Sequence, residues 1–420
     1  MGSVQNTLFQ AYNGDERVPT DIQDHYNAYP YPARDPKDER KRLITGSPSS
    51  PMEIDHHVFG GNRDWSQKIR ILVAGGGSGD GLIQIAQVLT DANRPYEITY
   101  LDLSVSARKI AKRRAKIREL KNITFVTGSL LDAAEYGTFD YIDCCGVLHH
   151  LPDLQAGFNA LANALAPKGG LGFMVYAPYG RSGVYPLQQA LGELSAGMTP
   201  QNRLAFGKSV FQNIPQNHQF MRNDLVGDHN ASDAGFYDLL LHSQDVSLTV
   251  REVTGLIQIA GLELASFTQP AMYSLDGLLP PDFKLPDDID AIGQMHLAEK
   301  LRGNMKTHVG YAMKQGDVVK INPINPSAIP HFIGEDPQKA AAFIIQRGGL
   351  PVAINGQKIG LGISPKAARL LGKVDGVATV GALWEKSELG LAEFNDTWGK
   401  LSDLLCGYGL MLYSGLNKPS

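Results

Sequence analysis

The chain has 420 residues, which exceeds the length of most single domains and predicts two domains with an inserted subdomain. With 43% hydrophobic and 20% charged residues it can form a packed core, and its formal net charge of −4 excludes a general electrostatic attraction to nucleic acid or anionic membranes. Three cysteines exclude a disulfide framework, no apolar run approaches the roughly 18 residues of a membrane span, and the N-terminus lacks a signal-peptide pattern, so we expect a cytoplasmic protein without a membrane partner.

The first part of the chain (1–65) is a polar, turn-rich N-terminal arm in which we find no helical periodicity. The tyrosines of segment 26–31 are expected to anchor an extended arm to the fold, and the alternative is that they close over a ligand. His56 and His57 lie in a Gly/Asn-rich loop, so we expect them to face solvent rather than to bind a metal ion.

An apolar strand pattern at 71–74 ends in the run 75–81 (GGGSGDG), and a helical pattern begins immediately afterwards. Glycine permits positive φ and lets a ligand lie against the backbone, so this strand–loop–helix unit predicts a nucleotide-type site at the carboxyl end of a parallel sheet. The dinucleotide pattern Gly-x-Gly-x-x-Gly fails in both frames, because its last position is Asp80 or Leu82. The pattern that fits is Gly-x-Gly-x-Gly, beginning at Gly75.

Strand and helix patterns alternate as far as residue 176, which predicts a doubly wound α/β sheet with right-handed crossovers. The expected strands are 70–74, 97–102, 122–126, 139–144 and 170–176, and the expected helices are 80–90, 104–120 and 154–166. Segment 166–170 (APKGG) is expected to form the turn into the fifth strand. The helix at 104–120 is densely basic, but its apolar stripe favours a solvated outer face and argues against nucleic acid as a partner.

Two further features fall at the same edge of the predicted sheet. The second strand ends in Asp102, 23 residues after Gly79, where a carboxylate can accept hydrogen bonds from both hydroxyls of a ribose. NAD enzymes place an acid in the same way, so Asp102 alone does not identify the ligand. The fourth strand leads into segment 139–152 (FDYIDCCGVLHHLP), whose strand end would line the same site.

Together these three elements, spread over about 80 residues, resemble the S-adenosylmethionine (SAM) site of class I methyltransferases. The resemblance implies a Rossmann-like, seven-stranded sheet with an antiparallel last strand, and SAM as the cofactor. The cofactor-binding residues that it implies are Gly75, Gly77, Gly79, Asp80, Asp102, Leu103, Ser129, Leu130, Cys145 and Gly146. The glycines would pack on the methionine part of SAM, and Cys145 and Gly146 would offer backbone groups beside the methyl donor.

The chain departs from the family at two positions. The acid that commonly ends the first strand is replaced by Val73, and the usual acid beside the adenine is replaced by Ser129. We expect Asp80 to take over part of the first role, near the methionine amino group. Asp102 would hold the ribose, and Ser129 and Leu130 would flank the adenine.

Methyl transfer needs alignment, exclusion of water and sometimes a base, but no metal ion or covalent intermediate. Of His149 and His150, we expect one to line the site and act as the base, and the other to satisfy backbone groups. Tyr176 and Tyr179 lie at the expected mouth of the site, where their rings either hold a cation or pack the lid. No metal ion is predicted, because adjacent cysteines and histidines on a strand point to opposite faces and no second ligand pair has zinc spacing.

After residue 176 the chain leaves the sheet, and segment 177–260 is expected to be a helical lid insertion that selects the substrate. Strands at 262–267 and 307–313 return to the sheet, so that the SAM-binding domain would span 66–318.

A Pro/Asn linker precedes a predicted C-terminal accessory domain (327–420) of α+β type. Segment 352–359 fits a hairpin with an Asn-Gly type I′ turn. The remaining expected elements are helices at 365–371, 378–386 and 391–405 and a last strand at 408–413. Small helices with a hairpin predict a winged-helix-like module, which is similar to C-terminal modules of bacterial protein-lysine methyltransferases.

The sequence therefore predicts a SAM-dependent methyltransferase whose acceptor is either a protein side chain or a small molecule. One alternative is an NAD(P)-dependent oxidoreductase, which the glycine spacing opposes. The other is a non-catalytic SAM- or nucleoside-binding sensor with the C-terminal domain as its output. N-, O- and C-methylation stay open, as does the oligomeric state.

Overall fold

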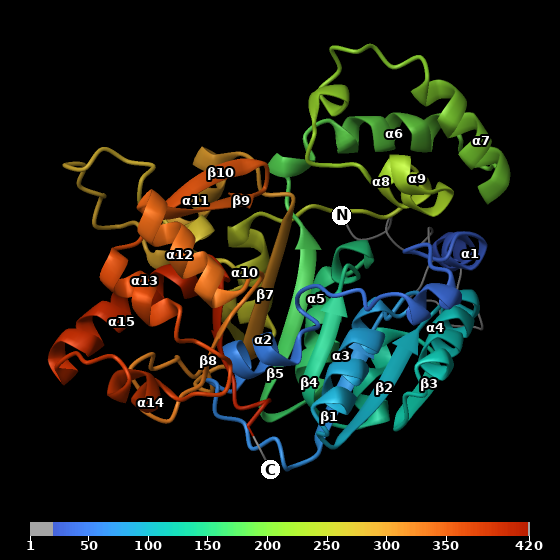
Figure 1. Ribbon diagram of the computed structural model, residues 1–420. Coiled ribbons are helices and arrows are strands. Elements are labelled where there is room, and N and C mark those ends of the chain that lie inside the picture. The colour runs from blue at the N-terminus through green and yellow to red at the C-terminus, as the bar shows by residue number, and fades with distance from the viewer. Residues whose placement is uncertain (1–19, 419–420) are drawn as a thin grey trace.

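Seven strands form one mixed sheet at the centre of the computed structural model, which describes residues 20–418 (Figure 1). The strand order is β3-β2-β1-β4-β5-β7-β6. The strands are β1 (Ile69–Ala74), β2 (Tyr96–Asp102), β3 (Ile123–Thr127), β4 (Phe139–Cys145), β5 (Leu165–Tyr176), β6 (Leu262–Phe267) and β7 (Thr307–Lys314). The first five are parallel, and β7 runs antiparallel to both β5 and β6. This confirms the predicted doubly wound sheet with an antiparallel seventh strand.

Helices cover both faces of the sheet, because β1 alternates its apolar side chains between them. Ile71 and Val73 belong to a buried cluster with α2, α3 and α4, whereas Leu72 and Ala74 belong to one with α5 and α10. The covering helices are α2 (Pro51–Val58), α3 (Asp80–Asp91), α4 (Val105–Ile117), α5 (Leu154–Ala164) and α10 (Val250–Ile259). Among residues 20–418, none of the helices has the length and hydropathy that crossing a membrane requires.

The boundary between α5 and β5 differs from the prediction. The helix ends at Ala164, two residues early, and the segment 166–170 belongs to the strand instead of forming a turn. Leu165 pairs with Phe139 on β4, and the register shifts beyond this pair, so a β-bulge accommodates the proline and glycines of the segment. The extension therefore depends on the neighbouring strand, which no local pattern reveals.

The N-terminal arm contains helices that the sequence pattern did not reveal, α1 (Thr20–Ala28) and the short 3₁₀ helix η2 (Pro36–Arg40) as well as α2. Residues 1–19 of the predicted arm lie outside the described residues.

The prediction that His56 and His57 face solvent is wrong. Their side chains are buried, with 7% and 8% of each residue exposed. His56 Nδ1 accepts the backbone N–H of Tyr413 at 2.9 Å, so the far end of the chain covers this part of the arm. A contact between residues this far apart in the sequence cannot be predicted from a local loop composition.

A buried ionic cluster ties the arm to α3 and α4. Glu39 of η2 accepts hydrogen bonds from Arg114 Nε at 2.6 Å and from Arg118 Nε. Arg114 also donates to Asp80 at 2.6 Å, and its side chain is fully buried. One member of the basic helix therefore points inward, against the expectation that its charges form an outer face.

Replacing Glu39 with glutamine should lower the free energy of unfolding by about 3 kcal/mol, because Arg114 stays buried with part of its charge unpaired. Urea unfolding followed by circular dichroism would show this as a lower midpoint. Asp38→Asn is the matched control, since it removes an exposed pair with Lys41 and should leave the midpoint unchanged. Equal midpoints for E39Q and the wild type would contradict a stabilising role for the cluster.

The insertion after β5 forms a helical unit over the carboxyl ends of the central strands (Figure 1). Its helices are α6 (Val184–Leu194), α7 (Pro200–Phe211), α8 (Asp228–Ala231) and α9 (Asp233–Leu240). They share their own apolar cluster, which includes Leu187, Phe220 and Phe236. The unit, called the lid below, is thus held together by a core separate from that of the sheet.

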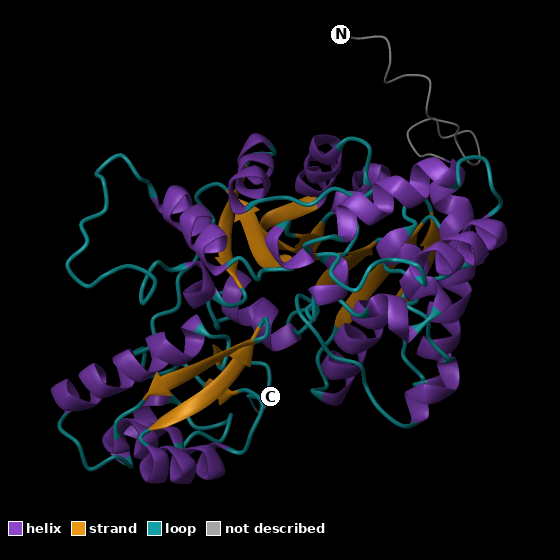
Figure 2. Ribbon diagram, turned by 90° about the horizontal axis from the view of Figure 1, so that it is seen from above, coloured by secondary structure: helices purple, strands orange, loops and turns teal. Residues whose placement is uncertain are grey.

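The C-terminal residues form a group of helices with two two-stranded antiparallel sheets, β9–β10 and β8–β11, beside the central sheet (Figure 2). Their core contains Trp398, which is fully buried. The elements are β8 (Pro330–Phe332), α12 (Pro337–Arg347), β9 (Gly349–Ile354), β10 (Gln357–Gly362), α13 (Pro365–Leu371), α14 (Val380–Glu385), α15 (Leu391–Gly407) and β11 (Met411–Tyr413). Positive φ at Asn355 and Gly356, +48° and +74°, confirms the predicted type I′ turn. The helix α12 and the strand β8 were not predicted.

Candidate active site

A cavity of about 530 Å³ lies at the carboxyl ends of the central strands. Its wall combines the loops after β1, β2 and β4, arm residues between 22 and 49, and lid residues between 226 and 238. The volume falls in the range of small-molecule sites. The cavity therefore occupies the edge at which the glycine run predicts a nucleotide-type site.

The glycine run adopts backbone conformations that other residues avoid. Gly75 and Gly77 line the cavity with φ of +68° and +51°. A Cβ on Gly77 would lie 2.7 Å from the carbonyl oxygen of Tyr31, so the arm packs directly on the loop. Gly79 does not line the cavity, and a Cβ there would lie 2.9 Å from the Cβ of Ala111 on α4. Gly79 allows close packing of α3 on α4, and its predicted contact with the cofactor stays a prediction.

Asp102 lines the cavity in a fixed orientation. Its Oδ2 accepts the N–H of Gly77 and its Oδ1 accepts the N–H of Ser104, both at 2.7 Å. Burial raises the pKa of Asp102 to about 6, against the opposing effect of these two bonds. The remaining lone pairs can accept two ligand hydroxyls. Leu103 also lines the cavity, and its carbonyl accepts a hydrogen bond from Gln23 Nε2 at 2.7 Å.

The other predicted cofactor residues also line the cavity, with part of their hydrogen-bonding capacity already used. Ser129 and Leu130 lie together in its wall, and the Ser129 hydroxyl caps the turn that follows. Cys145, an exposed residue, lines the cavity at the end of β4. The N–H of Gly146 donates to the carbonyl of Met174 at 3.1 Å, so this donor is not free for a ligand.

The carboxylate of Asp80 is already saturated. Arg34 donates to it through Nε at 3.0 Å and Nη2 at 2.6 Å, and Arg114 donates at 2.6 Å. Burial raises the pKa of Asp80, but the bonds and charges of the two arginines outweigh this effect and lower the pKa below its ordinary value. Asp80 lines the cavity, but its carboxylate ties the arm to α3, which argues against its expected role beside the methionine amino group.

The two neighbouring histidines have different surroundings. His150 lines the cavity, and its Nδ1 lies 2.9 Å from the carbonyl oxygen of Gln244. Since a carbonyl only accepts, Nδ1 carries the proton and Nε2 of the neutral ring presents a lone pair. His149 is fully buried outside the cavity wall, and neither of its ring nitrogens has a hydrogen-bond partner in the described part of the chain. The expectation that the second histidine satisfies backbone groups is therefore wrong.

The lid contributes an acid that sequence patterns did not reveal, Asp238 of α9. It lines the cavity with 3% of its surface exposed, and the hydroxyls of Tyr26 and Tyr176 each lie 3.3 Å from one of its oxygens. Tyr26 is also 3.1 Å from His242 Nε2, while His242 Nδ1 accepts the N–H of Gln244 at 3.0 Å. The proton of His242 is thus on Nε2, and a hydrogen-bond chain runs from His242 through Tyr26 to Asp238. Burial raises the pKa of Asp238 to about 6.

Two other tyrosines, Tyr31 and Tyr179, lie differently from the prediction with respect to the cavity. Tyr31 lines the cavity together with Tyr26, so part of the arm does close over the site. Tyr179 does not line the cavity, so its predicted catalytic role stays a prediction without support from the cavity geometry. Arg181 is buried, with its guanidinium 3.5 Å above the Tyr176 ring and 3.3 Å from Asp245.

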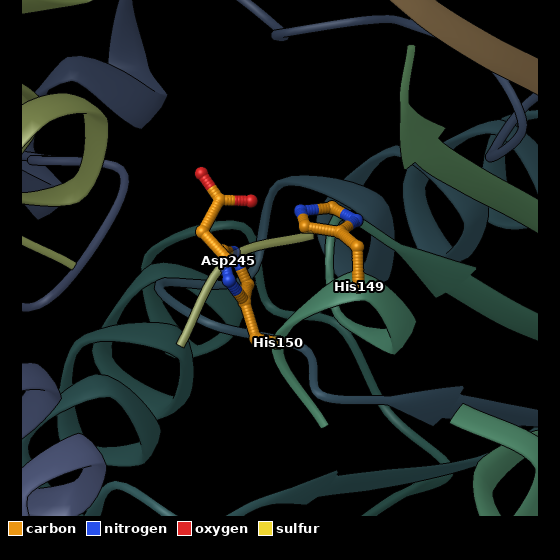
Figure 3. A group of neighbouring side chains, drawn as sticks. All are labelled: His149, His150 and Asp245. Carbon is orange, nitrogen blue, oxygen red and sulfur yellow. The ribbon is translucent and has the colours of Figure 1, made fainter. Parts of the chain in front are cut away.

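Two groups of side chains have spacings that suit a metal ion: His149, His150 and Asp245 (Figure 3), and His150, Asp238 and His242. In the second group, His242 Nε2 carries a proton and has no lone pair for a metal. In the first group, the charge of Arg181 beside Asp245 opposes a further cation. These contacts favour a hydrogen-bonded cluster, and the absence of a metal ion stays a prediction.

Comparisons with known proteins agree with this geometry. Residues 72–171 match the sequence pattern of the family described as "Methyltransferase domain", an interval that contains the glycine run, Asp102 and His150. An uncharacterised protein of Synechococcus sp. is 31% identical over 231 residues, which cover 54% of this chain and 54% of that protein. The chain thus spans about half the length of the curated relative that it matches.

Two solved structures of PKMT2 from Rickettsia typhi have a similar fold. One has a TM-score of 0.61 at 16% identity. The other, in complex with AdoHcy (S-adenosylhomocysteine), has a TM-score of 0.57 at 15% identity. Each match covers 89% of this chain and 77% of PKMT2. The likeness therefore extends well beyond the interval 72–171, and at these identities it concerns the fold alone.

Proposed function

We propose that this chain, which contains a class I SAM-dependent methyltransferase domain, transfers the methyl group of SAM to the side-chain amino group of a protein lysine. The observation that carries the SAM part is the glycine turn of Gly75 and Gly77 facing the oriented carboxylate of Asp102 in one cavity. The lysine part is supported by the fold shared with the protein-lysine methyltransferase PKMT2 and by the acid at the lid side of the cavity.

The residues of the sheet edge fit the cofactor chemically. Asp102 would accept hydrogen bonds from the ribose hydroxyls, and Ser129 and Leu130 would flank the adenine. Gly75 and Gly77 would lie against the methionine part, where a side chain on either residue would collide with its neighbours. When bound, SAM supplies a methyl group on a sulfonium, which an aligned nucleophile can attack in line.

The lid side of the cavity fits a cationic amine. Asp238 is a buried carboxylate held by two tyrosine hydroxyls, and the rings of Tyr26 and Tyr176 line the same wall. A lysine ammonium can exchange part of its water shell for charged hydrogen bonds to this carboxylate. Asp238 would therefore bind and orient the acceptor before transfer.

His150 would remove the proton that prevents the amine from reacting. A protonated amine has no lone pair, and a neutral imidazole nitrogen in the cavity wall can accept its proton. The carbonyl of Gln244 holds the proton of His150 on Nδ1 and leaves Nε2 as the acceptor. The proton would then reside on His150 while the nitrogen of the acceptor bonds to the methyl carbon, the carbon–sulfur bond breaks and the thioether leaves.

Labelled methyl transfer tests the proposal. Incubation of the protein with methyl-labelled SAM and a fractionated lysate should label proteins, and hydrolysis of the labelled protein should yield methylated lysine. His150→Gln should reduce the labelling rate about 100-fold, the usual effect of losing a general base, while binding of S-adenosylhomocysteine (AdoHcy) measured by calorimetry stays intact. Label found only in small molecules would refute the protein acceptor, and a protein that binds NAD but not AdoHcy would refute the cofactor.

A further inference from the structure

Asp143, on β4, is a buried carboxylate in the cavity wall that none of the steps above uses. It is 2% exposed and lines the cavity. The Ser49 side chain donates a hydrogen bond to it, and its Oδ2 has no partner among the described residues. A buried carboxylate with an unpaired oxygen is costly unless a ligand completes its hydrogen bonds. The missing partner should be a hydrogen-bond donor, preferably a positively charged one.

The position of Asp143 indicates which end of a bound cofactor would meet it. In the sheet, Asp143 is the register partner of Val73, which lies two residues before Gly75 at the start of the glycine turn. On its other side, a Cβ on Gly81 would lie 2.9 Å from Asp143 Oδ2 and 2.7 Å from Ser49 Oγ. Asp143 thus lies between the glycine turn and the first turn of α3, where the methionine part of SAM is expected.

We propose that Asp143 binds the α-ammonium group of the amino-acid part of SAM. The inference rests on the proposed function and adds a residue to it. Val73 occupies the position where the resemblance to methyltransferases leads us to expect an acid, and neighbouring strands lie about 4.8 Å apart. Asp143, the register partner of Val73 on β4, thus places a carboxylate one strand away from that position.

The other charged groups near this end of the cavity are already paired. Arg34, the cation that the arm contributes to the cavity wall, is held by both oxygens of Asp80. Asp80 is in turn saturated by Arg34 and Arg114, so it cannot bind an ammonium group. A carboxylate and one hydroxyl are too few ligands for a metal cage, which needs six or more oxygens for Ca²⁺. A primary ammonium group, with three donors, suits Asp143 better.

Calorimetric titration of the full chain tests this inference with three ligands. They are AdoHcy, an analogue with hydrogen in place of the α-amino group, and an analogue that lacks the carboxylate but keeps the amine. The wild type should bind AdoHcy about 10- to 100-fold more tightly than the deamino analogue, because a hydrogen bond between charged groups contributes a free energy of that size. Asp143→Asn should bind AdoHcy and the deamino analogue with equal affinity, and the decarboxylated ligand should lose affinity in this variant as AdoHcy does.

Equal affinity of the wild type for AdoHcy and the deamino analogue would overturn the inference, and so would a D143N variant that still discriminates between them. If D143N does not fold, Asp143→Ser replaces it, because serine is small and keeps the strand intact, and the same loss of discrimination is expected. A wild type that binds none of the three ligands would refute the proposed function itself. The two failures are therefore distinguishable.

Discussion

Replacing Asp102 with alanine is expected to weaken the binding of AdoHcy about 100-fold, equivalent to about 2.7 kcal/mol. The loss has two sources. The carboxylate would no longer accept the ribose hydroxyls, and the N–H groups of Gly77 and Ser104, each 2.7 Å from it, would lose their acceptor. Isothermal titration calorimetry with AdoHcy measures the change directly.

Glu97→Ala is the matched control for this prediction. Glu97 lies on the same strand, β2, but its side chain is exposed and contacts Lys68 at 3.6 Å, far from the cavity wall. Its removal should leave the affinity for AdoHcy unchanged. The affinity of the Asp102→Asn variant for AdoHcy should lie between those of D102A and the wild type, because the amide keeps one acceptor oxygen. An unchanged affinity in D102A would refute the ribose contact and with it the placement of the cofactor.

Replacing Asp238 with asparagine is expected to reduce labelling of the protein acceptor by at least about 100-fold, the effect of removing a buried charge partner from the acceptor amine. Binding of AdoHcy should change less than about threefold, because Asp238 belongs to the lid side of the cavity. The measurement pairs the labelling rate with calorimetry on the same preparation. Asp233→Asn is the control, since Asp233 lies on the same helix but pairs with Lys208 at the surface.

Acidification should lower the labelling rate of the wild type, as the D238N substitution does. Burial raises the pKa of Asp238 to about 6, so the carboxyl group becomes neutral as the pH falls through that value and can no longer hold an ammonium group. The labelling rate of the wild type should therefore fall below about pH 6. Burial raises the pKa of Asp102 to about 6 as well, so both proteins should also lose cofactor affinity in this range, and D238N should show a shallower decline than the wild type. If D238N labels proteins at the wild-type rate, Asp238 does not bind the acceptor.

Apart from the start of β5, the sheet and the cofactor side of the cavity were predictable because their elements depend mainly on chain neighbours. The apolar run 71–74 lies in β1, Gly75, Gly77 and Gly79 take positive φ, and Asp102 follows at the end of the next strand. The errors on this side concern contacts from elsewhere. Asp80 has the right spacing for a ligand contact, but Arg34 and Arg114 approach from two other segments and saturate it.

The lid side of the cavity was not predictable for the same physical reason. Asp238 and Tyr26 are separated by 212 positions, and no periodicity or motif links segments that far apart. The concentration of ionisable residues in segment 238–245 (DLLLHSQD) was the available signal, but it is also compatible with an ordinary helix end. Similarly, His149 and His150 are equivalent in the sequence, and only the carbonyl of Gln244 distinguishes them.

By itself, the sequence determined the alternation of strands and helices, the glycine turn and the acid beyond the second strand. These features follow from steric rules that act within a few tens of residues. Only the tertiary structure decided which carboxylates stay available, because packing pairs Asp80 with two arginines and leaves Asp143 with an unpaired oxygen. A side chain's chemistry depends on the groups that surround it, and here those groups come from the arm, the sheet and the lid together.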